Sequence, residues 1–100
     1  MKRDFISILD WTSEEIRSNL DLAVELKDQT KEGKCPQLLQ GKTFGLFFHK
    51  PSLRTRLSFE VGITQLGGTA IVLTEQDFKI GERETVSDVA RVMSRYVDCI

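Results

Sequence analysis

Hydrophobic residues along this chain form two kinds of pattern, one typical of buried strands and one typical of amphipathic helices. Two apolar runs, at residues 43–49 and 69–74, are nearly continuous, which favours strands of a parallel sheet that is covered on both faces. In three other segments, at residues 12–31, 57–66 and 86–96, apolar positions recur at helical spacing. The pattern therefore predicts alternating helices and strands.

The predicted order is helix, strand, helix, strand, helix and strand, with the last strand beginning at Val97. This alternation favours parallel strands joined by right-handed crossovers, so the expected fold class is α/β, a parallel sheet with helices on both faces. Residues 75–84 are polar and contain Gly81, which predicts a loop. One hundred residues allow one domain at most, and because residue 100 falls inside a predicted strand we expect an incomplete domain.

Polar residues mark where the predicted helices begin. Thr12 and Glu15 have the spacing of a capping box, Thr85 stands three residues before an aspartate in the same way, and Ser52 is placed to cap the middle helix. Glycines at residues 67–68 suit the end of that helix. The side chains expected to face the core are Ile16, Leu20, Ala23 and Val24 of the first helix, Leu57, Phe59, Val61, Ile63 and Leu66 of the second, and Val86, Val89, Val92, Met93 and Tyr96 of the third.

Composition narrows the class of protein. A hydrophobic fraction of 40% suits a folded chain, and a net charge of −1, from 14 basic and 15 acidic residues, argues against a nucleic-acid partner. Cys35 and Cys99 are read as reduced thiols, with a disulfide as the alternative. Without an apolar segment after the N-terminal residues, and without an apolar run of about 20 residues, the sequence predicts a cytoplasmic protein with no membrane partner.

The most distinctive chemistry lies between the first predicted strand and the second helix, where Ser52, Arg54 and Arg56 follow each other closely. Free backbone N–H groups and the positive end of the helix dipole favour an anion at such a helix start. An arginine adds a planar fork that binds phosphate or carboxylate through two hydrogen bonds. In open α/β sheets ligands bind at the carboxyl ends of strands, so we expect this segment and the loop at residues 75–84 to border one crevice.

Arg54 and Arg56 are two residues apart, so their side chains cannot face the same side of a helix. We expect one of them to hold the ligand. The other would brace the loop or pair with Glu60, which stands four residues after Arg56.

Other polar residues near this segment have two interpretations each. His49 is the only histidine, and it could act as a general base or serve a structural role. Lys79 could be a solvated loop residue or reach into a phosphate site of this subunit or of a neighbouring one. The sequence has no cluster of His, Cys, Asp and Glu at metal-ligand spacing, so no metal site is predicted.

These residues carry a family resemblance. Residues 48–60, Phe-His-Lys-Pro-Ser-Leu-Arg-Thr-Arg-Leu-Ser-Phe-Glu, and the Gln-Leu-Gly-Gly at residues 65–68 resemble the carbamoyl-phosphate-binding motif of the aspartate/ornithine carbamoyltransferase family. Residues 88–98 resemble the segment that follows in that family, and Ala-Arg-Val at residues 90–92 is closer to its ornithine-type members. The resemblance covers nearly the whole chain.

The resemblance implies that residues 1–100 form the N-terminal carbamoyl-phosphate-binding domain of a two-domain enzyme that assembles as a trimer or a multiple of trimers. It implies that carbamoyl phosphate is held by Ser52, Leu53 (through its backbone N–H), Arg54 and Thr55. Arg54 and Thr55 would be the catalytic pair, whereas Arg56, with Glu60, looks like a structural brace. Lys79 stands where ornithine-type members often present a glutamine to a neighbouring subunit.

The implied reaction transfers the carbamoyl group from carbamoyl phosphate to the side-chain amine of ornithine, giving citrulline and phosphate, as a step of arginine metabolism. The partners would be these two substrates, and no metal or organic cofactor is implied. The amino-acid-binding domain has no counterpart in residues 1–100, so this chain alone is expected to be inactive. Two alternatives stay open: an aspartate carbamoyltransferase of pyrimidine synthesis, and a non-catalytic module that binds an anion or mediates assembly.

Overall fold

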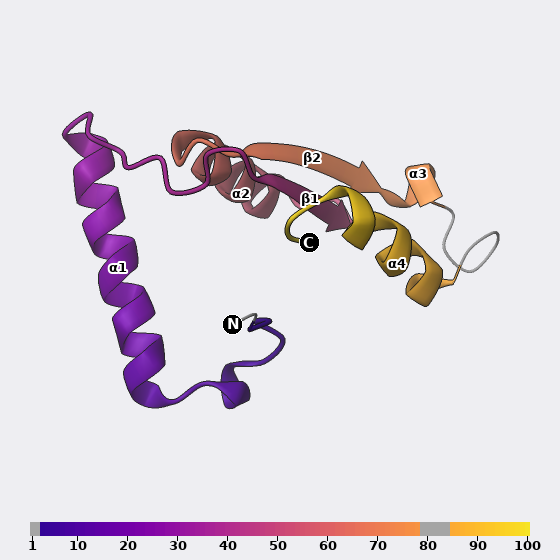
Figure 1. The fold of residues 1–100 in the computed structure, drawn as a ribbon, viewed down its shortest axis with the longest axis horizontal. Helices are drawn as coiled ribbons and strands as arrows, with labels where there is room; N and C mark the ends of the chain where they lie inside the picture. The colour runs from indigo at the N-terminus through magenta and orange to yellow at the C-terminus, as the bar shows by residue number, and fades with distance from the viewer. Residues whose placement is uncertain (1–2, 79–84) are drawn as a thin grey trace. The chain divides into compact units, whose positions relative to one another are not determined.

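The computed structural model describes residues 3–78 and 85–100, which fall within two compact units, Met1–Pro36 and Gln37–Ile100. The first unit contains the 3-10 helix η1 (Ile8–Asp10) and the helix α1 (Ser13–Lys31). The second unit contains the strands β1 and β2 and the helices α2, α3 and α4 (Figure 1). No described helix has the length and apolar character needed to cross a membrane.

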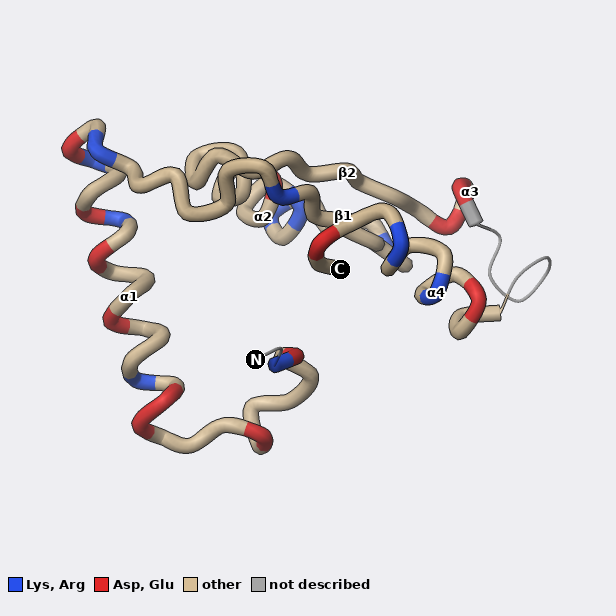
Figure 2. Tube along the Cα trace, viewed as in Figure 1, with Lys and Arg blue, Asp and Glu red and all other residues tan. Residues whose placement is uncertain are grey.

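Helix α1 begins as its sequence predicts. The backbone N–H of Glu15 donates to Thr12 Oγ1 at 3.1 Å, and the backbone N–H of Thr12 donates to Glu15 Oε1 at 3.0 Å, so the capping box is confirmed. No residue of α1 is buried, and Leu20 and Val24 of its predicted apolar face are 62% and 60% exposed. Along α1, basic and acidic residues are interspersed (Figure 2), so this helix presents no basic face.

A small cluster of side chains braces the start of α1. The guanidinium of Arg3 lies over the ring of Trp11, 3.9 Å from its centroid, and forms an ion pair with the carboxylate of Glu15. The hydrogen bond from Arg3, together with the one from the Thr12 backbone, lowers the pKa of Glu15 from 4.5 to about 2. The ionised form of Glu15 is therefore favoured by the folded segment.

This shift predicts an acid-dependent change at the N-terminal segment. Because the pKa of Glu15 is lower in the folded state, its contribution to stability is complete above pH 4.5 and is lost as the pH falls towards about 2. Trp11 is the only tryptophan, so its fluorescence should report the loss of the cluster over that pH range. The variant Glu15→Gln cannot titrate at this position, and an unchanged acid transition in that variant would contradict the assignment.

The second unit is built on two parallel strands. β1 (Thr43–Phe48) pairs with β2 (Thr69–Thr74) in a register that runs from Thr43 opposite Thr69 to Phe48 opposite Thr74. Helix α2 (Leu53–Gln65) connects the strands, and Figure 1 shows α2 and α4 (Val86–Tyr96) flanking the strand pair. The α/β fold and the parallel sheet predicted from the sequence are confirmed.

The far edge of β1 carries the start of a third pairing. Phe44 forms a parallel bridge with Cys99, and the backbone N–H of Gly45 donates to the Cys99 carbonyl at 2.8 Å. The carboxylate of Asp98 accepts a hydrogen bond from the Thr43 backbone N–H at 2.8 Å. The chain after α4 therefore returns beside β1 in the direction predicted for a third strand, with β1 between it and β2.

The core of the second unit is narrow. Ile63 of α2 and Val89 and Met93 of α4 are buried, each 5–6% exposed, as the sequence predicts. The prediction that the side chain faces the core was wrong for several other apolar residues, which are 47–83% exposed: Leu57, Phe59, Val61, Val86, Val92 and Tyr96. A pair of strands covers only one stripe of each helix, so apolar side chains outside that stripe stay largely exposed in the described residues.

Two loop predictions have different outcomes. Helix α2 ends at a glycine as expected: Gly67 has a φ of 91°, and the backbone N–H of Gly68 donates to the Ile63 carbonyl at 2.9 Å, as in a Schellman motif. The loop predicted from residue 75 was wrong at its start, because Glu75–Phe78 form the short helix α3. Asp77 explains this helix, since its carboxylate accepts a hydrogen bond from the Thr74 backbone N–H at 2.7 Å. Residues 79–84 lie outside the described residues.

Candidate anion-binding site

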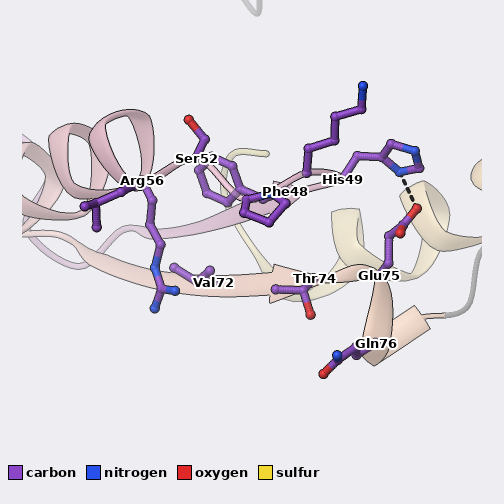
Figure 3. Close-up of a pocket in the computed structure, with 11 residues that line it drawn as sticks. Phe48, His49, Ser52, Arg56, Val72, Thr74, Glu75 and Gln76 are labelled. Atoms are coloured by element: carbon purple, nitrogen blue, oxygen red, sulfur yellow. Dashed lines mark ion pairs between the residues drawn. The ribbon is translucent and has the colours of Figure 1, made fainter.

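A pocket of about 480 Å³ lies where β1 and β2 end (Figure 3). Because the strands are parallel and in register, Phe48 and Thr74 stand opposite each other, and the segments that follow both strands meet at the same edge. The prediction that these two segments border one crevice is confirmed for Glu75 and Gln76, the residues of segment 75–84 that line the pocket. The lining residues are Phe48, His49, Lys50, Pro51, Ser52, Leu53, Arg56, Val72, Thr74, Glu75 and Gln76.

The N-terminus of α2 opens at this pocket without a side-chain cap. Ser52 occupies the N-cap position, but within the described chain no side chain caps α2, whereas Thr12 caps α1 and Thr85 caps α4. The hydroxyl of Ser52 and the first-turn N–H groups are therefore left for another acceptor. An anion at the positive end of the helix dipole satisfies those N–H groups.

Two cationic residues, Lys50 and Arg56, line the same pocket. Arg56 lies in the first turns of α2, and its side chain extends toward Val72 of β2 (Figure 3). The Nε of Arg56 lies 3.4 Å from Glu60 Oε1, which is the pairing proposed from the sequence. Lys50 lines the pocket from the segment between β1 and α2.

Only some of the predicted site residues line the pocket. Ser52 and Leu53 line it, and so does Arg56, to which the family resemblance gives a bracing role. Arg54 and Thr55 are exposed in the first turn of α2 and are not among the lining residues. Lys79 lies outside the described residues. The structure thus brings the start of α2 to the pocket, and the separate roles of Arg54, Thr55 and Arg56 stay predictions.

Sequence reasoning missed one contact at this site. His49 Nδ1 lies 2.5 Å from Glu75 Oε1, so the residue after β1 contacts the residue after β2. The sequence contains no local signal for this pair, because it depends on the register of two strands. Only the prediction that the strands are neighbours could have suggested it.

The site offers no metal-binding cluster in residues 3–78 and 85–100, where no three side chains of His, Cys, Asp and Glu gather as ligands. Apart from the His49–Glu75 pair, its chemistry consists of uncapped N–H groups, a hydroxyl and cations at the carboxyl edge of a parallel sheet. These groups suit a small phosphorylated ligand.

Comparison with known proteins identifies the family. Residues 3–100 match the model of the aspartate/ornithine carbamoyltransferase carbamoyl-P binding domain. The chain belongs to the aspartate/ornithine carbamoyltransferase family. The segment that carried the resemblance, residues 48–60, supplies most of the wall of the pocket on the α2 side.

Individual members of the carbamoyltransferase family share both sequence and fold with this chain. The ornithine carbamoyltransferase of Anoxybacillus flavithermus is 51% identical over 98 residues, which are 98% of this chain and 31% of the relative. The solved ornithine carbamoyltransferase from Pyrococcus furiosus is 49% identical with a TM-score of 0.90, over 96% of this chain and 31% of that one. This chain spans about a third of the length of these relatives.

Aspartate-type members of the family are also similar. The catalytic subunit of the aspartate transcarbamoylase of M. jannaschii is 37% identical with a TM-score of 0.83, over 93% of this chain and 31% of that one. The chain therefore has the carbamoyltransferase fold in both comparisons and shares more sequence with the two ornithine carbamoyltransferases named above than with this aspartate transcarbamoylase.

Proposed function

We propose that residues 1–100 are the carbamoyl-phosphate-binding domain of an ornithine carbamoyltransferase, which makes citrulline and phosphate from carbamoyl phosphate and ornithine. The proposal rests on one structural observation above all, the uncapped N-terminus of α2 opening into a pocket that also holds Arg56. The identity of 51% to an ornithine carbamoyltransferase, against 37% to an aspartate transcarbamoylase, favours ornithine as the acceptor.

In the proposed complex the phosphate of carbamoyl phosphate lies at the start of α2. The Ser52 hydroxyl and the Leu53 backbone N–H donate to its oxygens, and the guanidinium of Arg54 neutralises charge as phosphate leaves. The hydroxyl of Thr55 donates to the carbonyl oxygen, which becomes negative when the amine attacks. Catalysis then needs positioning and fixed positive charge, with no covalent nucleophile on the protein.

Assembly and location complete the proposal. We expect a homotrimer or a multiple of trimers, in which Lys79 serves the site of this subunit or of a neighbouring one. We expect the enzyme in the cytoplasm, as part of arginine biosynthesis. Gel filtration with light scattering would test the trimer directly, and a stable monomer with full activity would contradict it.

The deciding experiment is a transfer assay on the complete gene product that contains this chain. Carbamoyl phosphate would be supplied with ornithine or with aspartate in separate reactions, and citrulline and carbamoyl-aspartate would be measured. We expect citrulline only. Carbamoyl-aspartate would move the assignment to the aspartate-type enzyme, and phosphate binding without either product would indicate a non-catalytic anion-binding module.

A further inference from the structure

A carboxylate stands at the edge of the pocket that is proposed to hold a phosphate. Glu75 is the first residue of α3 and lines the pocket together with Lys50 and Arg56. Its side chain is 50% exposed. A free carboxylate beside a phosphate repels it and competes for the same cations. A phosphate can bind well at this site only if the Glu75 carboxylate is neutralised or kept away from it.

The structure supplies such a means in His49. The imidazole of His49 and the carboxylate of Glu75 point toward each other, and Nδ1 lies 2.5 Å from Oε1 (Figure 3). Neutral imidazole can donate the Nδ1 hydrogen to the carboxylate, and imidazolium also cancels its charge. The two side chains are 69% and 50% exposed, and an ion pair this exposed contributes little to the stability of the fold. Its effect is therefore expected in the electrostatics of the pocket.

We propose that His49 is a positioning residue that holds the Glu75 carboxylate away from the bound phosphate. The inference deepens the proposed function and rests on it. His49 follows β1 and Glu75 follows β2, so the pair lies across the same strand ends that bring the pocket together. Without His49, the carboxylate is free to turn toward Lys50 and Arg56. The phosphate then meets a repelling charge and fewer available cations.

Two single variants and their combination separate this role from a simple tether. In the complete gene product, His49→Gln should raise the KM for carbamoyl phosphate and the Kd for inorganic phosphate by about fivefold, because the charge of Glu75 in the pocket wall becomes unmasked. The kcat should change by less than about twofold, since His49 does not touch the reacting atoms in the proposed mechanism. Glu75→Gln removes the repelling charge and should bind phosphate somewhat more tightly than the wild type.

The double variant His49→Gln with Glu75→Gln gives the critical result. If His49 acts by masking a charge, the double variant should bind phosphate as Glu75→Gln does, because no carboxylate remains to be masked. If the pair is only a tether, the double variant, in which neither the imidazole nor the carboxylate remains, should bind phosphate as weakly as His49→Gln does. That second pattern would overturn the proposal.

Controls distinguish the possible failures. Arg95→Gln removes an exposed charge from α4 that does not line the pocket, and it should leave both constants unchanged. Equal thermal unfolding temperatures for all variants would exclude a folding defect. If every variant binds phosphate with the affinity of the wild type, the proposed role of His49 is wrong. The proposed function is not affected by that result. A wild-type protein that binds neither phosphate nor carbamoyl phosphate would overturn the proposed function, and this inference with it.

Discussion

Replacing Arg54 with alanine in the complete gene product is expected to lower kcat for carbamoyl transfer by about a hundredfold to a thousandfold. The guanidinium stands in the first turn of α2, beside N–H groups that no side chain caps. Losing it removes positive charge from the place where the departing phosphate gains negative charge. Steady-state kinetics with carbamoyl phosphate and ornithine would measure the effect on kcat and on KM separately.

Arg56→Ala is the informative companion of Arg54→Ala. Arg56 lines the pocket and lies 3.4 Å from Glu60, whereas Arg54 lies outside the lining, so the two positions test different assignments. If Arg54 binds the phosphate and Arg56 braces α2, the larger fall in kcat belongs to Arg54 and the larger fall in thermal stability to Arg56. Near-normal activity of Arg54→Ala together with inactive Arg56→Ala would exchange the two roles.

Replacing Met93 with alanine is expected to destabilise the protein by about 2–5 kcal/mol, the usual cost of truncating a buried Met, Leu or Ile. Met93 is 6% exposed, and its Cε lies 2.8 Å from the point that a Cβ on Gly45 would occupy, so it fills the contact between α4 and β1. Truncation leaves a cavity there that the sheet cannot close. The midpoint of urea unfolding, followed by circular dichroism, would measure the loss.

Val92 provides a matched control on the same helix. It precedes Met93 and is also apolar, but it is 51% exposed, so Val92→Ala should change stability by no more than about 0.5 kcal/mol. Equal shifts for the two variants would show that Val92 is covered in the complete protein. The comparison therefore tests the narrow core of this unit as well as the role of Met93.

Local chemistry explains which parts of the fold were predictable from sequence. The caps at Thr12 and Thr85 and the glycine at residue 67 act within one turn of chain, and the structure has each of them. The second strand was also placed at its observed bounds, because β-branched residues and flanking polar ones define it. These signals need no knowledge of the rest of the protein.

Features that depend on a partner were less predictable. Val86, Val92 and Tyr96 have helical spacing, but whether such residues are buried depends on how much of the helix another element covers. The start of α3 depends on a hydrogen bond from the Thr74 backbone N–H to the Asp77 carboxylate. The polar composition of this segment does not predict that bond.

The candidate site shows the same division. Its place at the strand ends followed from the sequence, since parallel strands align their carboxyl ends. Which side chains meet there could not be predicted from the sequence. The His49–Glu75 contact depends on the register of the strands, and the orientation of Arg56 depends on the pitch of α2. The family resemblance supplied roles for Arg54 and Thr55 that geometry alone would not have suggested.

The bridge between Phe44 and Cys99 has a consequence for synthesis of the protein on the ribosome. β1 pairs with β2 across a short connection through α2. The other edge of β1 pairs with a segment that is 55 residues further along the chain. Until that segment has been translated, β1 exposes unpaired N–H and C=O groups to other nascent chains. Slowed translation between α4 and residue 99 should therefore increase aggregation more than the same delay within α1.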